Sequence, residues 1–100
     1  DFHAVFEEVD FLVSPVMPTA AFPLGEKLQD PLQMYLSDMY TISASLAGIP
    51  ALSLPCGFTQ TGLPIGLQLM GRPFEESTIL RAAYAYEQST QWRKKRPPIR

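Results

Sequence analysis

The stretch from Met39 to Gly71 contains no Asp, Glu, Lys or Arg, and this feature constrains the fold more than any other. Between Pro31 and Gly71 the only charged residue is Asp38. A domain of this size has a large surface relative to its volume, so its interior should not need so many neutral residues in succession. We therefore expect the 100-residue chain to be a piece of a larger folded body.

The composition argues against several classes of protein. Hydrophobic residues make up 46% and charged residues 18%, which is typical of a globular chain rather than a disordered one, despite 10 prolines. The net charge of -2 gives no general attraction to nucleic acid or to an anionic membrane. Pro50, Pro55 and Pro64 interrupt the neutral stretch and argue against a membrane span.

The single cysteine and the start of the chain indicate the compartment. One cysteine cannot form an internal disulfide and matches no zinc spacing, so we expect neither an oxidised scaffold nor a metal site. No cationic segment followed by an apolar run opens the chain, so we expect no secretory signal. Both observations favour a cytoplasmic protein.

Apolar side chains recur at helical spacing in three segments, which are residues 2–9, 31–47 and 75–89. The second segment has the clearest boundaries. Asp30 is placed to cap the first turn, and Pro31 is suited to the first helical position. Gly48 can end the helix in the left-handed conformation. We expect one continuous helix over residues 31–47, with Asp38 at the border of its apolar face.

Three segments have the pattern of strands, namely residues 11–16, 51–57 and 65–71. The last two flank a turn that contains Thr61-Gly62 and Pro64, which predicts an antiparallel hairpin. Because two strands are not stable alone in water, the hairpin must join a sheet formed by residues outside the chain or by the strand at residues 11–16. Pro15 lacks an amide hydrogen, so that strand should lie at an edge or end near Pro15.

The chain contains no self-sufficient catalytic set, and we predict no catalytic residue in it. His3 lies on an expected surface helix, where a surface histidine is the better interpretation than a triad base. Cys56 follows a proline at the end of an expected buried strand, and we interpret it as a small hydrophobic residue. No G-x-S-x-G, H-E-x-x-H or P-loop motif occurs.

Asp38 is the candidate binding residue. Thr41 and Ser45 follow it on the same side of the expected helix, and such a polar stripe can simply face solvent. Against that interpretation, no other charge follows before Arg72, whereas a surface stripe normally carries several. An enclosed carboxylate without a partner costs on the order of 3 to 5 kcal/mol, so it needs a cation or several donors. The ammonium group of a substrate would serve.

Residues 92–100 form a basic tail that includes Arg93-Lys94-Lys95-Arg96. We favour a solvated end after the last helix. The alternative is a contact with RNA phosphates or with a neighbouring protein of the same complex, because clustered cations favour phosphate binding.

Two neutral motifs that contain glycine and proline are LAGIPALSLPCG at residues 46–57 and GLPIGLQLMG at residues 62–71. In these motifs the sequence resembles the C-terminal part of the amidase signature family, and the resemblance covers nearly the whole chain. Further matches are Val13-Ser14-Pro15 with Pro18-Thr19, Asp30-Pro31-Leu32 with Met34-Tyr35 and Asp38, and Tyr86-Glu87-Gln88 with Arg96-Pro97-Pro98. In these further segments the sequence is similar in particular to the glutaminase subunits of tRNA-dependent amidotransferases.

The resemblance implies an α/β fold, the C-terminal portion of the amidase signature fold, in which helices cover a mixed β-sheet. Residues 1–100 would be one fragment of a single amidase domain, with a helix-hairpin-helix core. The resemblance also implies a Ser, cis-Ser and Lys triad that lies upstream and matches nothing in this chain. It identifies Asp38 as the acid that binds the α-ammonium of glutamine.

The implied activity is hydrolysis of glutamine through an acyl-enzyme. The ammonia would pass to a partner subunit that activates Glu-tRNA(Gln) or Asp-tRNA(Asn) with ATP and Mg²⁺. The expected partners are therefore glutamine, the B and C subunits and, through the complex, tRNA. We expect no cofactor in this segment and no activity from it alone. Two alternatives stay open: an amidase of the same family that acts on another small amide, and a non-catalytic assembly segment.

Overall fold

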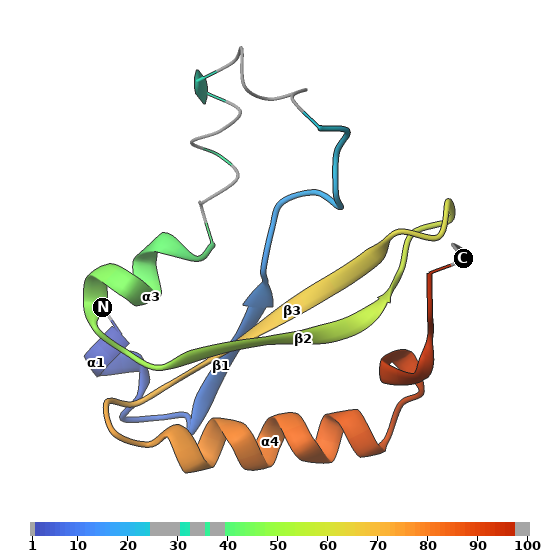
Figure 1. Ribbon diagram of the computed structural model, residues 1–100. Coiled ribbons are helices and arrows are strands. Elements are labelled where there is room, and N and C mark those ends of the chain that lie inside the picture. Colours follow the sequence, from blue (N-terminus) through green and yellow to red (C-terminus); the bar gives the residue numbers. More distant parts are fainter. Residues whose placement is uncertain (1, 25–30, 33–35, 37–39, 98–100) are drawn as a thin grey trace.

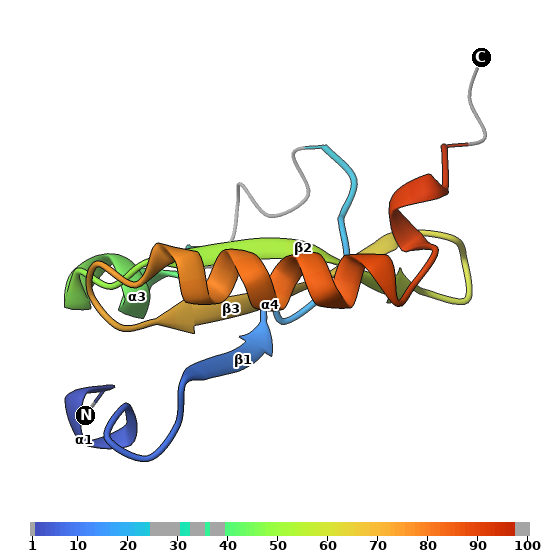
Figure 2. The same ribbon diagram turned by 90° about the horizontal axis from the view of Figure 1, so that it is seen from below.

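The structure is a computed structural model that describes residues 2–24, 31–32, 36 and 40–97. A three-stranded antiparallel sheet forms its framework, and one long helix crosses one face of this sheet (Figures 1 and 2). The strands are β1 (Phe11–Pro15), β2 (Ala51–Phe58) and β3 (Pro64–Gly71). Their order is β1-β3-β2, so β3 is the central strand.

Strands β2 and β3 form the predicted antiparallel hairpin. Leu52 pairs with Leu69 and Leu54 pairs with Leu67, so these four leucines lie on the same face. The turn closes with the amide of Thr59, which donates to the carbonyl oxygen of Leu63 at 2.8 Å. The pairing shifts register between Pro55 and Gly57, where β2 bulges.

Strand β1 confirms the prediction made from its prolines. It pairs with β3 over its whole length, from Phe11 opposite Gly71 to Pro15 opposite Leu67. It lies at an edge of the sheet and ends at Pro15, where a proline cannot donate to a neighbouring strand. The hairpin therefore gains its third strand from within the chain.

The helices differ in how well the periodicity predicts them. Helix α4 (Glu76–Gln88) agrees closely with the expected segment 75–89. Helix α1 (Phe2–Val5) is shorter than expected, because turns replace the helix after Val5. Helix α3 (Ile42–Ala47) ends at Gly48, which has φ 72°, in agreement with the left-handed conformation expected there.

The expectation of one continuous helix over residues 31–47 is wrong at Tyr40. Pro31, Leu32 and Leu36 are helical, but Tyr40 and Thr41 form a turn and α3 begins only at Ile42. The side chain of Gln68, on the central strand, donates to the Tyr40 carbonyl oxygen. This tertiary hydrogen bond provides the carbonyl with a partner outside a helix.

The core lies between the sheet and α4. Its buried members are Leu54, Leu69, Ile79 and Ala83, with partly buried side chains such as Leu52 and Tyr86 packed around them. Gly71 allows the close approach of β3 to α4, since a Cβ atom at this position would lie 2.8 Å from Ile79 Cγ2. On α4, the side chains of Ile79 and Ala83 thus face the sheet.

Much apolar surface lies outside this core. On α4, Leu80 is 55% and Tyr84 is 64% exposed, next to the outer edge of β2. Leu46 and Phe74 are also exposed. Surfaces of this kind are normally covered by further protein.

Within the described part of the chain, no helix combines the length and hydrophobicity that crossing a bilayer requires.

Candidate functional site

A polar row crosses the sheet on the face that points away from α4. Ser14 on β1 and Ser53 on β2 both pair with Gln68 on β3. Because side chains alternate along a strand, Gln68 lies on the opposite face from Leu67 and Leu69, which pack toward α4. The two faces of the sheet therefore have different chemistry.

Gln68 is the buried polar side chain of this row and is only 5% exposed. Its Nε2 donates to Ser14 Oγ at 3.1 Å and to the Tyr40 carbonyl oxygen at 2.8 Å. The Ser14 hydroxyl in turn donates to the Pro15 carbonyl oxygen at 3.0 Å. Gln68 thereby ties the turn before α3 to two strands of the sheet.

Asp38, the predicted binding residue, lies outside the described residues. Tyr40 is the first described residue after it, and the contact with Gln68 fixes the backbone at this point. Of the two residues expected to share its polar stripe, Thr41 is half-buried and Ser45 is exposed. The described backbone that comes nearest to Asp38 in sequence on this side is therefore anchored to the sheet.

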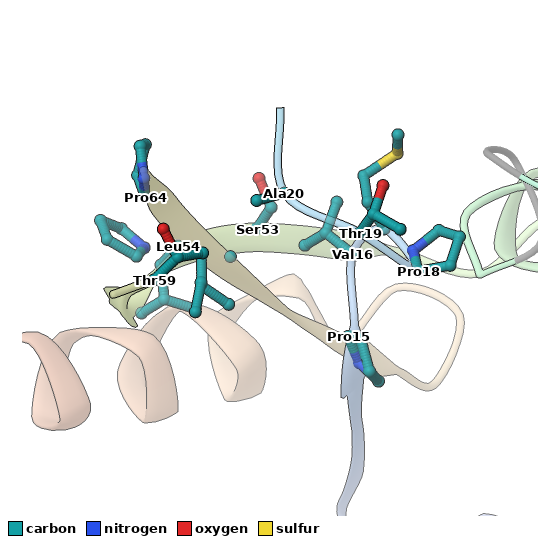
Figure 3. Close-up of a pocket in the computed structure, with 13 residues that line it drawn as sticks. Pro15, Val16, Pro18, Thr19, Ala20, Ser53, Leu54, Thr59 and Pro64 are labelled. Atoms are coloured by element: carbon teal, nitrogen blue, oxygen red, sulfur yellow. The ribbon is translucent and has the colours of Figure 1, made fainter. Parts of the chain in front are cut away.

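A cavity of about 580 Å³ lies beside the polar row (Figure 3). The segment 15–20 forms one wall and the β2–β3 hairpin forms the other. Ser53 and Gly66, which line the cavity, are the neighbours of Gln68 across the sheet and along β3. A Cβ atom on Gly66 would lie 3.3 Å from Val16 Cγ2, so the glycine lets segment 15–20 approach the sheet closely.

The lining of this cavity is mostly apolar, with hydroxyl groups from Thr19, Ser53 and Thr59 and no ionisable side chain among the described residues. Its volume lies in the range of small-molecule sites. Such a wall can bury apolar groups and hydrogen-bond to neutral ones. A charged substrate would need a charged group from elsewhere.

A second cavity, of about 630 Å³, lies between α1, the end of α3 and the β3–α4 turn. Arg72 lines this cavity and forms both hydrogen bonds and ion pairs. The guanidinium donates from Nε to the Phe6 carbonyl oxygen at 3.0 Å and from Nη2 to the Val9 carbonyl oxygen at 2.9 Å. It also lies 3.6 Å from Glu75 Oε1 and 3.8 Å from Asp10 Oδ1. Arg72 therefore joins the turns that follow α1 to the β3–α4 turn.

The structure also shows where the two other candidate residues from the sequence, His3 and Cys56, are placed. His3 is on the surface, as expected, with its side chain 88% exposed and Nε2 3.8 Å from Glu7 Oε1. Cys56 has a free thiol and is half-buried at the β2 bulge. Among the described residues no group of three or more His, Cys, Asp or Glu side chains could hold a metal ion.

Comparison with known proteins identifies the family. A family model described as Amidase matches residues 1–80 of the chain. The chain belongs to the Amidase family. The resemblance carried by the two glycine- and proline-containing motifs is therefore confirmed.

Curated relatives of this Amidase chain are named as the A subunit of glutamyl-tRNA(Gln) amidotransferase. The one from Thermodesulfovibrio yellowstonii is 63% identical over 97 residues, which are 97% of this chain and 20% of the relative. The one from Moorella thermoacetica is 62% identical over 99 residues, or 99% of this chain and 20% of the relative. The chain thus spans about a fifth of the length of these relatives.

A solved structure gives the same picture. The crystal structure of the A subunit of glutamyl-tRNA(Gln) amidotransferase from Thermotoga maritima is similar with a TM-score of 0.82 and 42% sequence identity. The match covers 88% of this chain and 19% of that chain. The α/β fold class expected for this Amidase segment is confirmed.

Proposed function

We propose that this chain is the C-terminal segment of the glutaminase subunit of a tRNA-dependent amidotransferase. The observation that carries the proposal is the 63% identity, over 97% of the chain, to a protein named as the A subunit of glutamyl-tRNA(Gln) amidotransferase. The full protein would hydrolyse glutamine and supply ammonia for the conversion of Glu-tRNA(Gln) or Asp-tRNA(Asn). It would work in the cytoplasm as part of a ligase complex of protein biosynthesis.

The chemistry of amide cleavage would belong to residues upstream of this chain. In the proposed reaction a serine of a Ser, cis-Ser and Lys triad attacks the side-chain amide carbonyl of glutamine, and ammonia leaves as the acyl-enzyme forms. Water then releases glutamate. The ammonia reaches a partner subunit, which activates the aminoacyl-tRNA with ATP and Mg²⁺. We expect partners of the B and C type and no cofactor bound by this segment.

This segment would contribute part of the wall of the glutamine site, within the mixed sheet of a single amidase domain. Alone it should be inactive, because it carries no nucleophile and base set. The helix-hairpin-helix arrangement would be its local core. The neutral, hydroxyl-bearing face beside Gln68 suits a wall that borders an uncharged amide.

Within this wall we assign to Asp38 the role of binding the α-ammonium group of glutamine. No other Asp, Glu, Lys or Arg occurs between Pro31 and Gly71, so an enclosed Asp38 has no cation near it in sequence. A substrate ammonium group would neutralise it and satisfy its acceptors. The backbone two residues later is held at Tyr40 by Gln68.

The test is to replace Asp38 by Asn or Ala in the full-length protein, assembled with its partner subunits. Glutamine-dependent amidation of tRNA should fall, while amidation driven by added ammonia should persist, because ammonia bypasses the glutamine site. Asp10→Asn is the matched control, since the Asp10 side chain is 83% exposed.

The outcome also separates the alternatives. If both activities stay normal in the Asp38 variants, the assignment of Asp38 is wrong. Hydrolysis of an apolar amide without any need for Asp38 would favour an amidase with another substrate. Loss of complex assembly, with hydrolysis intact, would favour the assembly segment.

A further inference from the structure

We propose that Phe74 is an anchor residue whose ring is buried, in the full-length protein, against the part of the polypeptide that lies outside this chain. The inference goes beyond the proposed function and rests on it only for the statement that the chain is a segment of a longer protein. Two observations on this one residue carry it, namely a strained backbone and an exposed aromatic ring.

Phe74 occupies a turn position that normally belongs to glycine. The amide of Glu75 donates to the carbonyl oxygen of Arg72 at 3.0 Å, so Pro73 and Phe74 are the central residues of a hydrogen-bonded β-turn. Phe74 has φ 66° and is the one described residue other than glycine with a positive φ. In a turn with proline at the second position, a positive φ at the third is typical of glycine or asparagine. A phenylalanine in this conformation lowers the folding equilibrium constant about 5- to 150-fold.

The contacts around the turn hold this strained conformation in place. Arg72 Nε donates to the Phe6 carbonyl oxygen at 3.0 Å, and Arg72 Nη1 lies 3.6 Å from Glu75 Oε1. Before the turn, the amide of Gly71 donates to the Pro50 carbonyl oxygen at 3.0 Å. Helix α4 begins directly after the turn. The backbone is therefore held on both sides, which is the condition under which a strained residue persists.

The ring of Phe74 gains little from the described part of the chain. The residue is 95% exposed, although a phenylalanine side chain contributes to stability through burial. Its neighbours Pro73 and Glu75 line the second cavity, between α1, the end of α3 and the β3–α4 turn. With the ring exposed in this way, glycine at the same position would give a more stable fold. The strain is explained if the ring is buried by protein beyond the described residues.

The remainder of the same polypeptide is the occupant that fits both observations. The 97 matched residues are 20% of the relative from Thermodesulfovibrio yellowstonii, so about four-fifths of such a protein lies outside this chain. A contact within one polypeptide forms in every folded molecule and at any protein concentration. It therefore offsets the strain wherever the strain is present, whereas a second copy or a partner subunit would do so only in an assembly.

The surroundings of Phe74 are also open to further protein. The turn that carries Phe74 lies at the same end of the sheet as α1 and α3 (Figures 1 and 2). Leu46 on α3 is 81% exposed, and the second cavity lies between these elements. We therefore expect an apolar pocket of the amidase domain to receive the ring, within a larger contact at this end of the segment.

The decisive variant is Phe74→Gly in the full-length subunit, studied without its partner subunits. Glycine relieves the strain and removes the ring, so the direction of the effect shows whether the ring is buried. Truncation of a buried phenylalanine raises the unfolding equilibrium constant by about 10² to 10³ or more, which exceeds the gain from relieved strain. We expect a net rise of about tenfold or more, measured by urea denaturation. An unchanged or lower unfolding constant overturns the proposal.

Gly62→Phe is the matched control for the strain. Gly62 has φ 92°, and a Cβ atom there would meet no heavy atom within 4 Å. Phenylalanine at this position should raise the unfolding constant by strain alone, about 5- to 150-fold. If Phe74→Gly lowers the constant by a similar factor and weakens assembly with the partner subunits, the ring belongs to an interface between subunits and the proposal is wrong.

Hydroxyl-radical footprinting of the unsubstituted full-length protein does not depend on any variant being stable. Modification of Phe74 should be about fivefold slower in the native than in the unfolded protein, in proportion to the exposed area that is lost. Equal rates overturn the proposal even if Phe74→Gly does not fold. Neither measurement needs a substrate, so the result is independent of the Asp38 test: an exposed Phe74 leaves the proposed reaction untouched, and normal activity of the Asp38 variants leaves the anchor untouched.

Discussion

Arg72 and Val9 are joined by a hydrogen bond of 2.9 Å from the guanidinium Nη2 to the carbonyl oxygen of Val9. The same guanidinium donates from Nε to the carbonyl oxygen of Phe6, 66 residues away in the sequence. The carbonyl groups after the short helix α1 have no helical partners, and an arginine can satisfy several of them at once. Arg72 thus links the turns that follow α1 to the β3–α4 turn, beside the buried side chain of Phe6.

Replacing Arg72 by Lys in the full-length protein should therefore lower the free energy of unfolding by about 1 to 3 kcal/mol. Lysine keeps the charge but cannot reproduce the planar set of donors. Urea denaturation measures the change. Arg81→Lys, at an exposed position on α4, is the control and should stay within about 0.5 kcal/mol of the parent protein. Equal effects at both positions would show that the hydrogen bonds from Arg72 to the Phe6 and Val9 carbonyl oxygens do not stabilise the fold.

Gly71→Ala tests the contact between β3 and α4. The added Cβ would lie 2.8 Å from Ile79 Cγ2, so a well-packed contact must shift. We expect the free energy of unfolding to fall by about 1 to 3 kcal/mol, as for overpacked cores. In the Ile79→Ala background the same substitution should cost clearly less, because the opposing methyl is gone. An equal cost in both backgrounds would show that the strain arises elsewhere.

Elements with strong local signals can be predicted from the sequence. The hairpin and the end of β1 at Pro15 follow from residues within each segment. The end of α3 at Gly48 follows in the same way. The turn at Tyr40 cannot be predicted, because its carbonyl is bound by Gln68, 28 residues away. Apolar spacing extends across this turn without a break.

The site is harder to predict than the fold. The inference about Asp38 depends on the absence of neighbouring charges, and it stays a prediction because the residue lies outside the described part of the chain. Gln68 escapes a sequence search because a polar residue between Leu67 and Leu69 is the normal pattern of a half-exposed strand. The one hint in the sequence is that Gln68 lies in a stretch without charged residues, where a buried polar side chain needs hydrogen-bond partners. The contacts of Arg72 cannot be predicted from the sequence, because its acceptors are backbone carbonyl oxygens, which every residue has.

The 100-residue chain expressed alone should tend to aggregate and show no amidase activity. Leu80 and Tyr84 are more than half exposed beside the outer edge of β2, which is unpaired in the described part of the chain. Exposed apolar side chains at a strand edge favour association between copies. Size-exclusion chromatography and binding of a hydrophobic dye measure this. A monomer that melts cooperatively would contradict the expectation.

The basic segment contains two kinds of cation, and their substitution should have different effects. Arg93 Nη1 donates to the carbonyl oxygens of Glu87 and Thr90, at 2.7 and 3.1 Å, near the end of α4. Arg93→Gln should therefore lower the free energy of unfolding of the full-length protein by about 0.5 to 1.5 kcal/mol, as measured by urea denaturation.

The exposed pair Lys94 and Lys95 provides the contrast. Changing both to Gln should leave the unfolding free energy within about 0.5 kcal/mol, because neither residue forms an ion pair with a described residue. The same double variant separates a solvated end from an RNA contact. Two lost phosphate contacts would reduce the slope of log affinity for tRNA against log salt by about 2, whereas a solvated end leaves the slope unchanged. We expect an unchanged slope, since Arg93 donates to the Glu87 and Thr90 carbonyl oxygens at the end of α4, and Lys94 and Lys95 are exposed.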